Sequence, residues 1–346
     1  MAMCSEDRIS SLPDHILCHI LSFLPLKEAV RTSIISTKWR YLFASISTIE
    51  FDDSLLSGLT DRNVDSFKNF VDRLLKFPDQ VSLDCFRLRD GISWNDEDHD
   101  FDVSGWICAA LCRGVKEIDL FLDYFGCVLT VPAVLFTCHS LVTLKLNAEC
   151  RKIDVPSDVC LGNLKTLQLR NTVVDGDSIH SDRETSATHL IQGIIQGICT
   201  VRSLNLTIND VIFRTCRLPI FHNLIKFEYG VLGSNGRETW LVEFLHCAPN
   251  LNTLTLNFLV VVETQWKVLH MEVPSCLSLH LKEIKILNFK GDAQMFEMIS
   301  YFLDNAMVLE KLMIGMKSLS ETQQSIVFNQ LLQLPKSSKK CQVVIF

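Results

Sequence analysis

The sequence has no long apolar run and no excess of basic residues. Its apolar stretches stay well below the roughly 20 residues that a membrane-spanning helix needs. The opening MAMCSEDRIS lacks the apolar core of a secretory signal. The formal net charge of −7 provides no basic face for a nucleic acid. These absences favour a protein that binds neither membranes nor nucleic acids, and we expect it inside the cell, in the cytoplasm, the nucleus or both.

The 14 cysteines do not form the patterns of disulfide frameworks or metal sites. No Cys-x-x-Cys pair occurs, and Cys108 and Cys112 have no second His or Cys pair nearby at zinc-binding spacing. The cysteines stand singly among apolar residues, as reduced core cysteines do. We therefore predict free thiols in a reducing compartment and no bound metal.

Motifs of catalysis are also missing. No GxSxG, HExxH, GxGxxG or P-loop string occurs. The acidic run at 95–106 alternates aspartates as a calcium loop does, but Phe101 replaces the turn glycine and Ile107 replaces the bidentate glutamate. A solvated loop explains this run better than a metal site. We predict a protein that is not an enzyme and needs no cofactor.

The chain does contain a recurring six-residue pattern: an apolar residue, two variable residues, an apolar residue, one variable residue and an apolar residue. The clear copies are VKEIDL from 115, LVTLKL from 141, LKTLQL from 164, VRSLNL from 201, LIKFEY from 224, LNTLTL from 251, LKEIKI from 281 and LEKLMI from 309. LDCFRL from 83 and ISTIEF from 46 are weaker copies.

In a strand, the fourth and sixth positions of the pattern share one face. One strand cannot bury that face alone, but stacked parallel copies bury it continuously. The pattern therefore predicts an irregular α/β solenoid with a parallel sheet on its concave face, from about residue 115 to 346. The copies that begin at residues 164 and 201 start 37 residues apart, whereas the intervals before and after them are both 23 residues. We expect a local defect around 172–200, flanked by strands that still pair directly.

Between the strands, apolar residues at helical spacing predict helices. The segments are 67–77, 103–114, 188–199, 238–250 and 292–306. Gly114 suits the end of the second helix, Pro249 ends the fourth, and Asp292 is a natural N-cap of the fifth.

The first 45 residues have a different organisation. Leu17, Ile20, Leu21 and Leu24 have helical spacing after Pro13, and Pro25 ends that helix. LKEAVRTSIIS predicts a second short helix and TKWRYLF a third, which the hydroxyl of Ser36 is placed to cap. Three short helices are too small a unit to be stable alone. We expect them to dock on the solenoid, on another protein, or on both.

This segment resembles an F-box. The similarity lies in Leu12-Pro13-Asp14, ILCHILSFLP, and the spaced Ala29, Ser33, Ser36 and Trp39. The repeats resemble those of plant F-box/leucine-rich-repeat proteins, and the tail from about 293 resembles their C-terminal FBD module. The resemblance implies an F-box over 5–50, leucine-rich repeats over 51–290 and an FBD-like module over 291–346. In this family further repeats usually follow VVDGDSIH, so we expect missing repeats near 180–181.

The resemblance implies a substrate-recognition subunit of a Skp-cullin-F-box ubiquitin ligase. Its partners would be a Skp-family adaptor, a cullin reached through that adaptor, and a protein substrate. A leucine-rich scaffold outside any ligase, or a non-productive shortened paralogue, stays open as the alternative. The family pattern implies these adaptor-binding residues, some by contact and some by fixing helix geometry: Leu12, Pro13, Ile16, Ile20, Leu24, Val30 and Trp39.

Substrate-binding residues follow from the strand pattern. The third and fifth positions of each copy point away from the buried face, so they line the concave side. From these positions we predict the following substrate-binding residues: Asp119, Lys145, Gln168, Asn205, Glu228, Thr255 and Lys285.

Overall fold

A computed structural model describes most of the chain. The described residues are 7–51, 64–76, 82–90, 102–122, 130–148, 152–153, 159–170, 193–207, 217–231, 239–259, 266, 272–316 and 320–346. They form two compact units, Met1–Ile153 and Asp154–Phe346. None of the described helices is long and apolar enough to cross a membrane.

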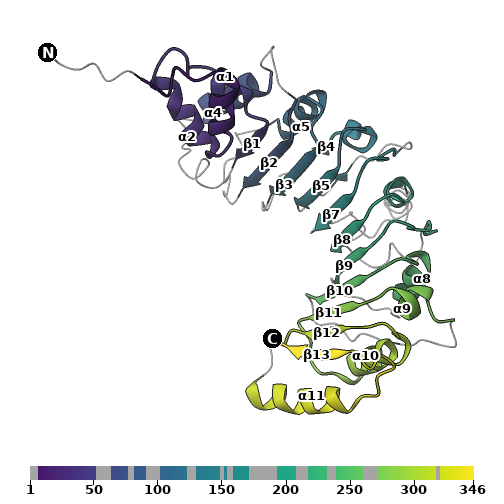
Figure 1. Cartoon of the computed structure of the whole chain (residues 1–346). Coiled ribbons are helices and arrows are strands. Elements are labelled where there is room, and N and C mark those ends of the chain that lie inside the picture. The colour runs from purple at the N-terminus through teal and green to yellow at the C-terminus, as the bar shows by residue number, and fades with distance from the viewer. Residues whose placement is uncertain are drawn as a thin grey trace. The chain divides into compact units, whose positions relative to one another are not determined.

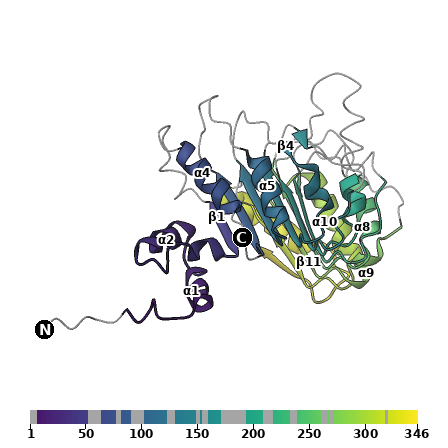
Figure 2. The same ribbon diagram turned by 90° about the horizontal axis from the view of Figure 1, so that it is seen from above.

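The first unit starts with the short helices α1 (Asp14–Leu21) and α2 (Leu26–Arg31). Pro13 and Pro25 immediately precede them in extended conformation, with ψ of 147° and 145°. Each proline fixes the start of a helix, because its ring presets φ and its missing N–H has no intrahelical partner at that position. Helix α2 lies beside the first strand of the unit (Figures 1 and 2).

The segment expected to form a third helix does so only in part. After α2 come the 3₁₀ turn η1 (Thr32–Ile34), a series of turns, and the 3₁₀ turn η2 (Leu42–Ser45). Here Trp39 N–H donates to the carbonyl of Ser36 and Leu42 N–H to that of Trp39, both three residues back. Such bonds define 3₁₀ geometry, which rarely extends beyond one turn. The predicted Ser36 cap is wrong, since its hydroxyl is buried without a hydrogen-bond partner.

A parallel sheet follows in the first unit. Its strands are β1 (Thr48–Phe51), β2 (Cys85–Asp90), β3 (Glu117–Leu122) and β5 (Thr143–Ala148), paired in that order. The two weaker pattern copies therefore are strands, β1 and β2. Helices α4 (Val64–Leu75) and α5 (Val103–Cys112) lie on one side of this sheet (Figure 2).

The second unit continues the same plan. Its strands pair in parallel in the order β7 (Thr166–Arg170), β8 (Ser203–Thr207), β9 (Lys226–Val231), β10 (Thr253–Phe258), β11 (Glu283–Leu287), β12 (Lys311–Ile314) and β13 (Gln342–Ile345). Among its helices are α8 (Thr239–Cys247), α9 (Ser275–Leu279), α10 (Ala293–Asn305) and α11 (Glu321–Gln333). Figure 1 shows the strands side by side.

Parallel pairing confirms the predicted solenoid architecture within each unit. β7 pairs with β8 in register despite the 37-residue step, Leu167 opposite Leu204. The interval itself, at 171–192, lies outside the described residues, as does 95–101 of the acidic run. Strand β13, and helices α9 and α11, were not predicted.

The predicted helix ends are largely confirmed. Asp292 caps α10 by accepting a hydrogen bond from Met295 N–H at 2.8 Å. Gly114 follows α5 with a φ of 69°, the left-handed conformation that glycine adopts without strain. Of the helix expected at 188–199, the described part is helical at 193–197. A small pair, β4 (Thr130–Val131) with β6 (Lys152–Ile153), and the 3₁₀ turn η3 (Ala133–Thr137) complete the described elements.

The strands alternate between a buried face and a half-buried face. In β10 and β7 every second residue is buried, as the pattern predicts. The buried face packs on helices through aromatic rings. Phe227 of β9 stacks on Phe244 of α8 at 4.0 Å between centroids, and Tyr229 lies 4.5 Å from Trp240. We call the opposite, half-buried face of each unit's sheet its open face.

Candidate functional site

One candidate surface lies on the N-terminal helices. Leu17 and Leu21 of α1 form a core with Ala29, Trp39 and Ile46. Ile16 and Ile20 each stand one position before a core leucine, so they share a face about 100° round the helix from the core face. The same exposed stripe continues through Phe23 and Leu24. The four side chains on it are exposed: Ile16 by 37%, Ile20 by 39%, Phe23 by 75% and Leu24 by 38%.

The predicted adaptor-binding residues fall into two groups. Pro13, Ile16, Ile20 and Leu24 are exposed, Leu12 and Val30 are half-buried, and Trp39 is buried. The exposed side chains are available for contact. Trp39 instead occupies the core, and its indole Nε1 donates to Ser10 Oγ at 2.8 Å.

Two contacts fix the start of α1. Lys38 Nζ donates to the carbonyl oxygen of Leu12 at 2.5 Å and lies 3.5 Å from Asp14 Oδ1. Together with the Trp39–Ser10 bond, they hold the Leu12-Pro13 segment against the turns that follow α2. The geometry assigns Lys38 and Trp39 to positioning this surface.

The sequence pattern missed several exposed apolar side chains on the same unit. Phe23, Ile34, Ile35 and Tyr41 are exposed, Ile34 by 87%. The signal was present for Phe23, since it stands seven residues after Ile16 on the helical stripe. The exposure of Ile34 and Ile35 was harder to predict from the sequence. The segment was expected to be a helix, whereas these residues lie in and directly after the 3₁₀ turn η1.

The second candidate surface is the open face of each sheet. Parallel register places the predicted residues in rows. In the first unit, Glu50, Arg87, Asp119 and Lys145 are successive partners across β1, β2, β3 and β5. In the second unit the row runs Gln168, Asn205, Glu228, Thr255 and Lys285. Predicted positions of each unit thus do share one face.

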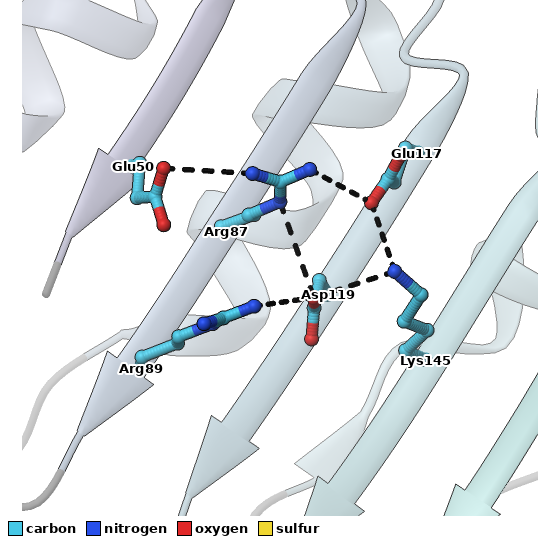
Figure 3. A network of polar contacts seen from close by, with 6 residues as sticks. All are labelled: Glu50, Arg87, Arg89, Glu117, Asp119 and Lys145. Atoms are coloured by element: carbon cyan, nitrogen blue, oxygen red, sulfur yellow. Dashed lines mark hydrogen bonds and ion pairs between the residues drawn. The ribbon is translucent and has the colours of Figure 1, made fainter.

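Six charged side chains meet on the first unit's open face (Figure 3). Arg87 lies centrally, with Nη1 3.5 Å from Glu50 Oε2 and Nη2 3.2 Å from Glu117 Oε1. Lys145 Nζ lies 3.2 Å from Glu117 Oε1 and 3.6 Å from Asp119 Oδ2. Three acids and three bases balance, so this network carries no net charge.

Arg89, near the C-terminal end of β2, completes the network. Its Nη2 donates to Asp119 Oδ2 at 3.3 Å. Arg87 Nε also faces Asp119 Oδ2, at 3.9 Å, too far for a hydrogen bond. Asp119 therefore has basic groups from Arg87, Arg89 and Lys145 around one oxygen. The prediction named Asp119 and Lys145 and missed Glu50, Arg87 and Arg89, which lie on or directly after the weaker pattern copies.

The network changes the ionisation of its members. Burial raises the pKa of Glu117, but hydrogen bonds from Lys145 and Arg87 lower it more, so the carboxyl's pKa lies below its ordinary 4.5. Glu117 is therefore ionised at neutral pH and remains so into mildly acidic solution.

The second unit's row is less connected. Glu228 pairs with Arg170, with Oε1 3.1 Å from Nη2, and Lys285 Nζ lies 5.3 Å above the Phe346 ring. Gln168 and Thr255 are half-buried. Asn205 Oδ1 is buried and has no hydrogen-bond partner among the described residues. This row is mixed in charge, as expected from the sequence.

The described residues provide little for nucleophilic or metal chemistry. Within them no three His, Cys, Asp or Glu side chains come together as metal ligands. Burial raises the pKa of the Cys85 thiol to about 11 and that of Cys276 to about 12. These two thiols stay protonated at neutral pH, and only a thiolate is a strong nucleophile.

Comparison with known families identifies three segments. The F-box domain family matches residues 9–49, and the FBD family matches residues 271–314. The repeats of "FBD-associated F-box protein At5g56370, LRR repeats" match residues 103–186. The FBD match contains α9, β11, α10 and β12, so this segment consists of two further repeats of the same sheet.

Several Arabidopsis thaliana proteins are similar to the chain. F-box/LRR-repeat protein At3g59200 is 42% identical over 180 residues, covering 49% of this chain and 32% of the relative. F-box/LRR-repeat protein At3g42770 is 26% identical over 434 positions, covering 97% and 80%. F-box protein At3g44060 is 26% identical over 431 positions, covering 96% and 99%. The last two alignments are longer than the 346 residues here, so both relatives have residues without a counterpart in this chain.

Proposed function

The chain is an F-box/LRR-repeat protein with an FBD domain and plant homologues, and from this premise we propose that it recruits a protein substrate to a Skp-cullin-F-box ubiquitin ligase. Its F-box binds a Skp-family adaptor, which connects it to a cullin. Its repeats bind the substrate. The chain itself catalyses no step; the ligase gains rate because a substrate lysine is held near the ubiquitin carrier.

The single observation that carries this proposal is the exposed stripe of Ile16, Ile20, Phe23 and Leu24. A four-residue apolar stripe on a small unit is typical of an interface, since exposed apolar patches usually meet a partner. The stripe belongs to the segment that matches the F-box family, residues 9–49. Leu12, Pro13 and Val30 are the further proposed adaptor-binding residues, and Trp39 supports the unit from within its core.

The proposed division of labour follows the chain. Residues 5–50 bind the adaptor, and residues 51–290 carry the substrate surface on the open faces. Residues 291–346 form an FBD-like module that extends the repeats. Asp119, Lys145, Gln168, Asn205, Glu228, Thr255 and Lys285 are the proposed substrate contacts.

A second candidate is supported by the long alignments with two relatives. If repeats near 180–181 are missing, as the 37-residue step suggests, the inherited substrate surface is altered while the F-box stays intact. The protein would then be a shortened paralogue or a repeat scaffold that delivers no substrate. Direct β7–β8 pairing is compatible with this, because solenoid stability is nearly a sum over neighbouring repeats.

Co-purification tests the ligase role. The tagged chain, expressed in plant cells, should retain both a Skp-family adaptor and a cullin. A variant carrying Leu12→Ala and Pro13→Ala should lose both together, while its repeats stay folded by circular dichroism. Retention of neither partner by the intact, folded chain would favour the scaffold candidate.

A further inference from the structure

Arg89 is the most accessible charged group of the open-face network. Its side chain is 52% exposed, whereas those of Asp119 and Glu117 are 11% and 27% exposed. Within the part of the chain that the structure describes, only its Nη2 is engaged, by Asp119. A guanidinium carries five N–H donors in a planar fork. Arg89 therefore keeps donors at Nε and Nη1 for a ligand.

Phe121 stands next to Arg89 on the same face. The two residues are register partners on β2 and β3, and adjacent strands lie about 5 Å apart. The Phe121 side chain is 39% exposed, although it belongs to a row otherwise occupied by polar and charged groups. An exposed aromatic ring beside an oriented arginine combines the two residue types that dominate binding energy at interfaces.

We propose that Arg89 and Phe121 bind an acidic–apolar segment of the protein substrate. A carboxylate of the segment accepts two hydrogen bonds from Arg89, and a neighbouring apolar side chain covers Phe121. This inference rests on the proposed function, since it assigns a substrate class to that function's open face.

The charge arrangement selects a carboxylate over a basic side chain. Glu117 and Asp119 are the two least exposed members of the network, and each faces two or more bases, whereas Glu50, 37% exposed, faces Arg87. At Glu117 or Asp119 a basic ligand would have to displace Lys145 or an arginine. An acidic ligand can accept hydrogen bonds from Nε and Nη1 of Arg89. Bidentate arginine–carboxylate pairs are among the strongest hydrogen bonds in proteins.

The same arrangement selects a carboxylate over a phosphate. A phosphoryl group carries between about −1.5 and −2 charge at pH 7. Glu50, Glu117 and Asp119 all lie on this face, so they repel a dianion more strongly than a single carboxylate. An aspartate or glutamate in the substrate is therefore the better fit.

A peptide selection tests the inference. A phage-displayed library of random peptides is selected on the intact chain bound to its adaptor. We expect enrichment of Asp or Glu close to a large apolar residue. The best selected peptide, made with a fluorescent label, should then bind Arg89→Gln about tenfold more weakly, as expected for loss of a charge-assisted pair. Phe121→Ser should weaken it similarly.

Arg170→Gln is the matched control. Arg170 is also a half-exposed arginine on an open face, paired with one carboxylate, but it belongs to the second unit. Its replacement should change the peptide's affinity less than twofold. Charge reversal, Arg89→Glu, should shift the selection toward basic peptides.

The inference is overturned by selection without acidic enrichment, by equal effects of Arg89→Gln and Arg170→Gln, or by a phosphoserine peptide that binds tighter than its glutamate counterpart. Adaptor binding is measured on the same preparations. If the chain retains adaptor but selects no acidic peptide, this inference alone fails. If it retains no adaptor, the proposed function fails, and the selection on the free chain still decides whether Arg89 and Phe121 bind acidic segments.

Discussion

Replacing Phe23 by alanine should weaken adaptor binding without unfolding the F-box. Phe23 is 75% exposed and lies on the exposed stripe with Ile16, Ile20 and Leu24, just after the end of α1. Full burial of a phenylalanine is worth about 1.5–3 kcal/mol. Covering the exposed three quarters in a complex would therefore contribute about 1–2 kcal/mol. Phe23→Ala should lower adaptor affinity by about 5- to 30-fold.

The expected effect on folding is small, because an exposed side chain contributes little to the core. A surface change of this kind usually alters the free energy of unfolding by less than about 0.5 kcal/mol. Leu17→Ala is the matched control on the same helix. Leu17 is fully buried, so its truncation should cost about 2–5 kcal/mol of F-box stability. Below its unfolding temperature, that variant should bind adaptor with nearly unchanged affinity.

Calorimetric titration with purified adaptor, together with thermal unfolding of each variant, separates the two effects. The reasoning predicts that Phe23→Ala changes affinity and spares stability, and that Leu17→Ala does the opposite. If Phe23→Ala binds adaptor with unchanged affinity, the exposed stripe is not the adaptor contact surface.

Three further predictions concern the interactions that hold the sites. Trp39→Phe keeps the ring in the core but loses the 2.8 Å bond to Ser10, so denaturant unfolding of the F-box should show a loss of about 1 kcal/mol; no loss would mean that the bond is not formed in solution. The folded-state pKa of Glu117 lies below 4.5, so its contribution to stability is present above about pH 4.5 and is lost as pH falls through the lower folded value. Glu117→Gln should therefore make the free energy of unfolding depend less on pH between about pH 6 and 3. An unchanged pH dependence of stability in this range would contradict the assignment. Asp292→Ala removes the cap of α10 and should cost about 1 kcal/mol, seen as faster hydrogen exchange at Met295, while Asp304→Ala near the other end of the helix should leave that amide unchanged.

The strands were predictable because their physics is local. A buried residue at every second position is visible in the sequence, and parallel stacking follows from the inability of one strand to bury its face alone. Strand β13 was not predicted because its sequence does not fit the pattern. Gln342 pairs with Lys311, so Lys340 occupies the first position of the pattern, where the copy in β12 has the apolar Leu309. An edge strand tolerates that lysine, since nothing packs beyond it among the described strands.

The candidate surfaces were predictable only in outline. Strand alternation placed Asp119 and Lys145 together on the open face, but the ion pairs depend on side-chain conformations across four neighbouring strands. The same limit applies to Trp39. Trp39 belongs to the sequence pattern by which the segment resembles an F-box. Only the packing shows that it lies in the core beneath the exposed stripe.

The most direct test of the account is titration of a purified Skp-family adaptor into the intact, purified chain. The account predicts a saturable one-to-one complex with a dissociation constant of about 1 µM or tighter, lost on combined Leu12→Ala and Pro13→Ala substitution. No detectable binding by a folded chain at adaptor concentrations of about 100 µM, where any affinity useful for recruitment would be seen, would contradict it and leave a free-standing repeat scaffold.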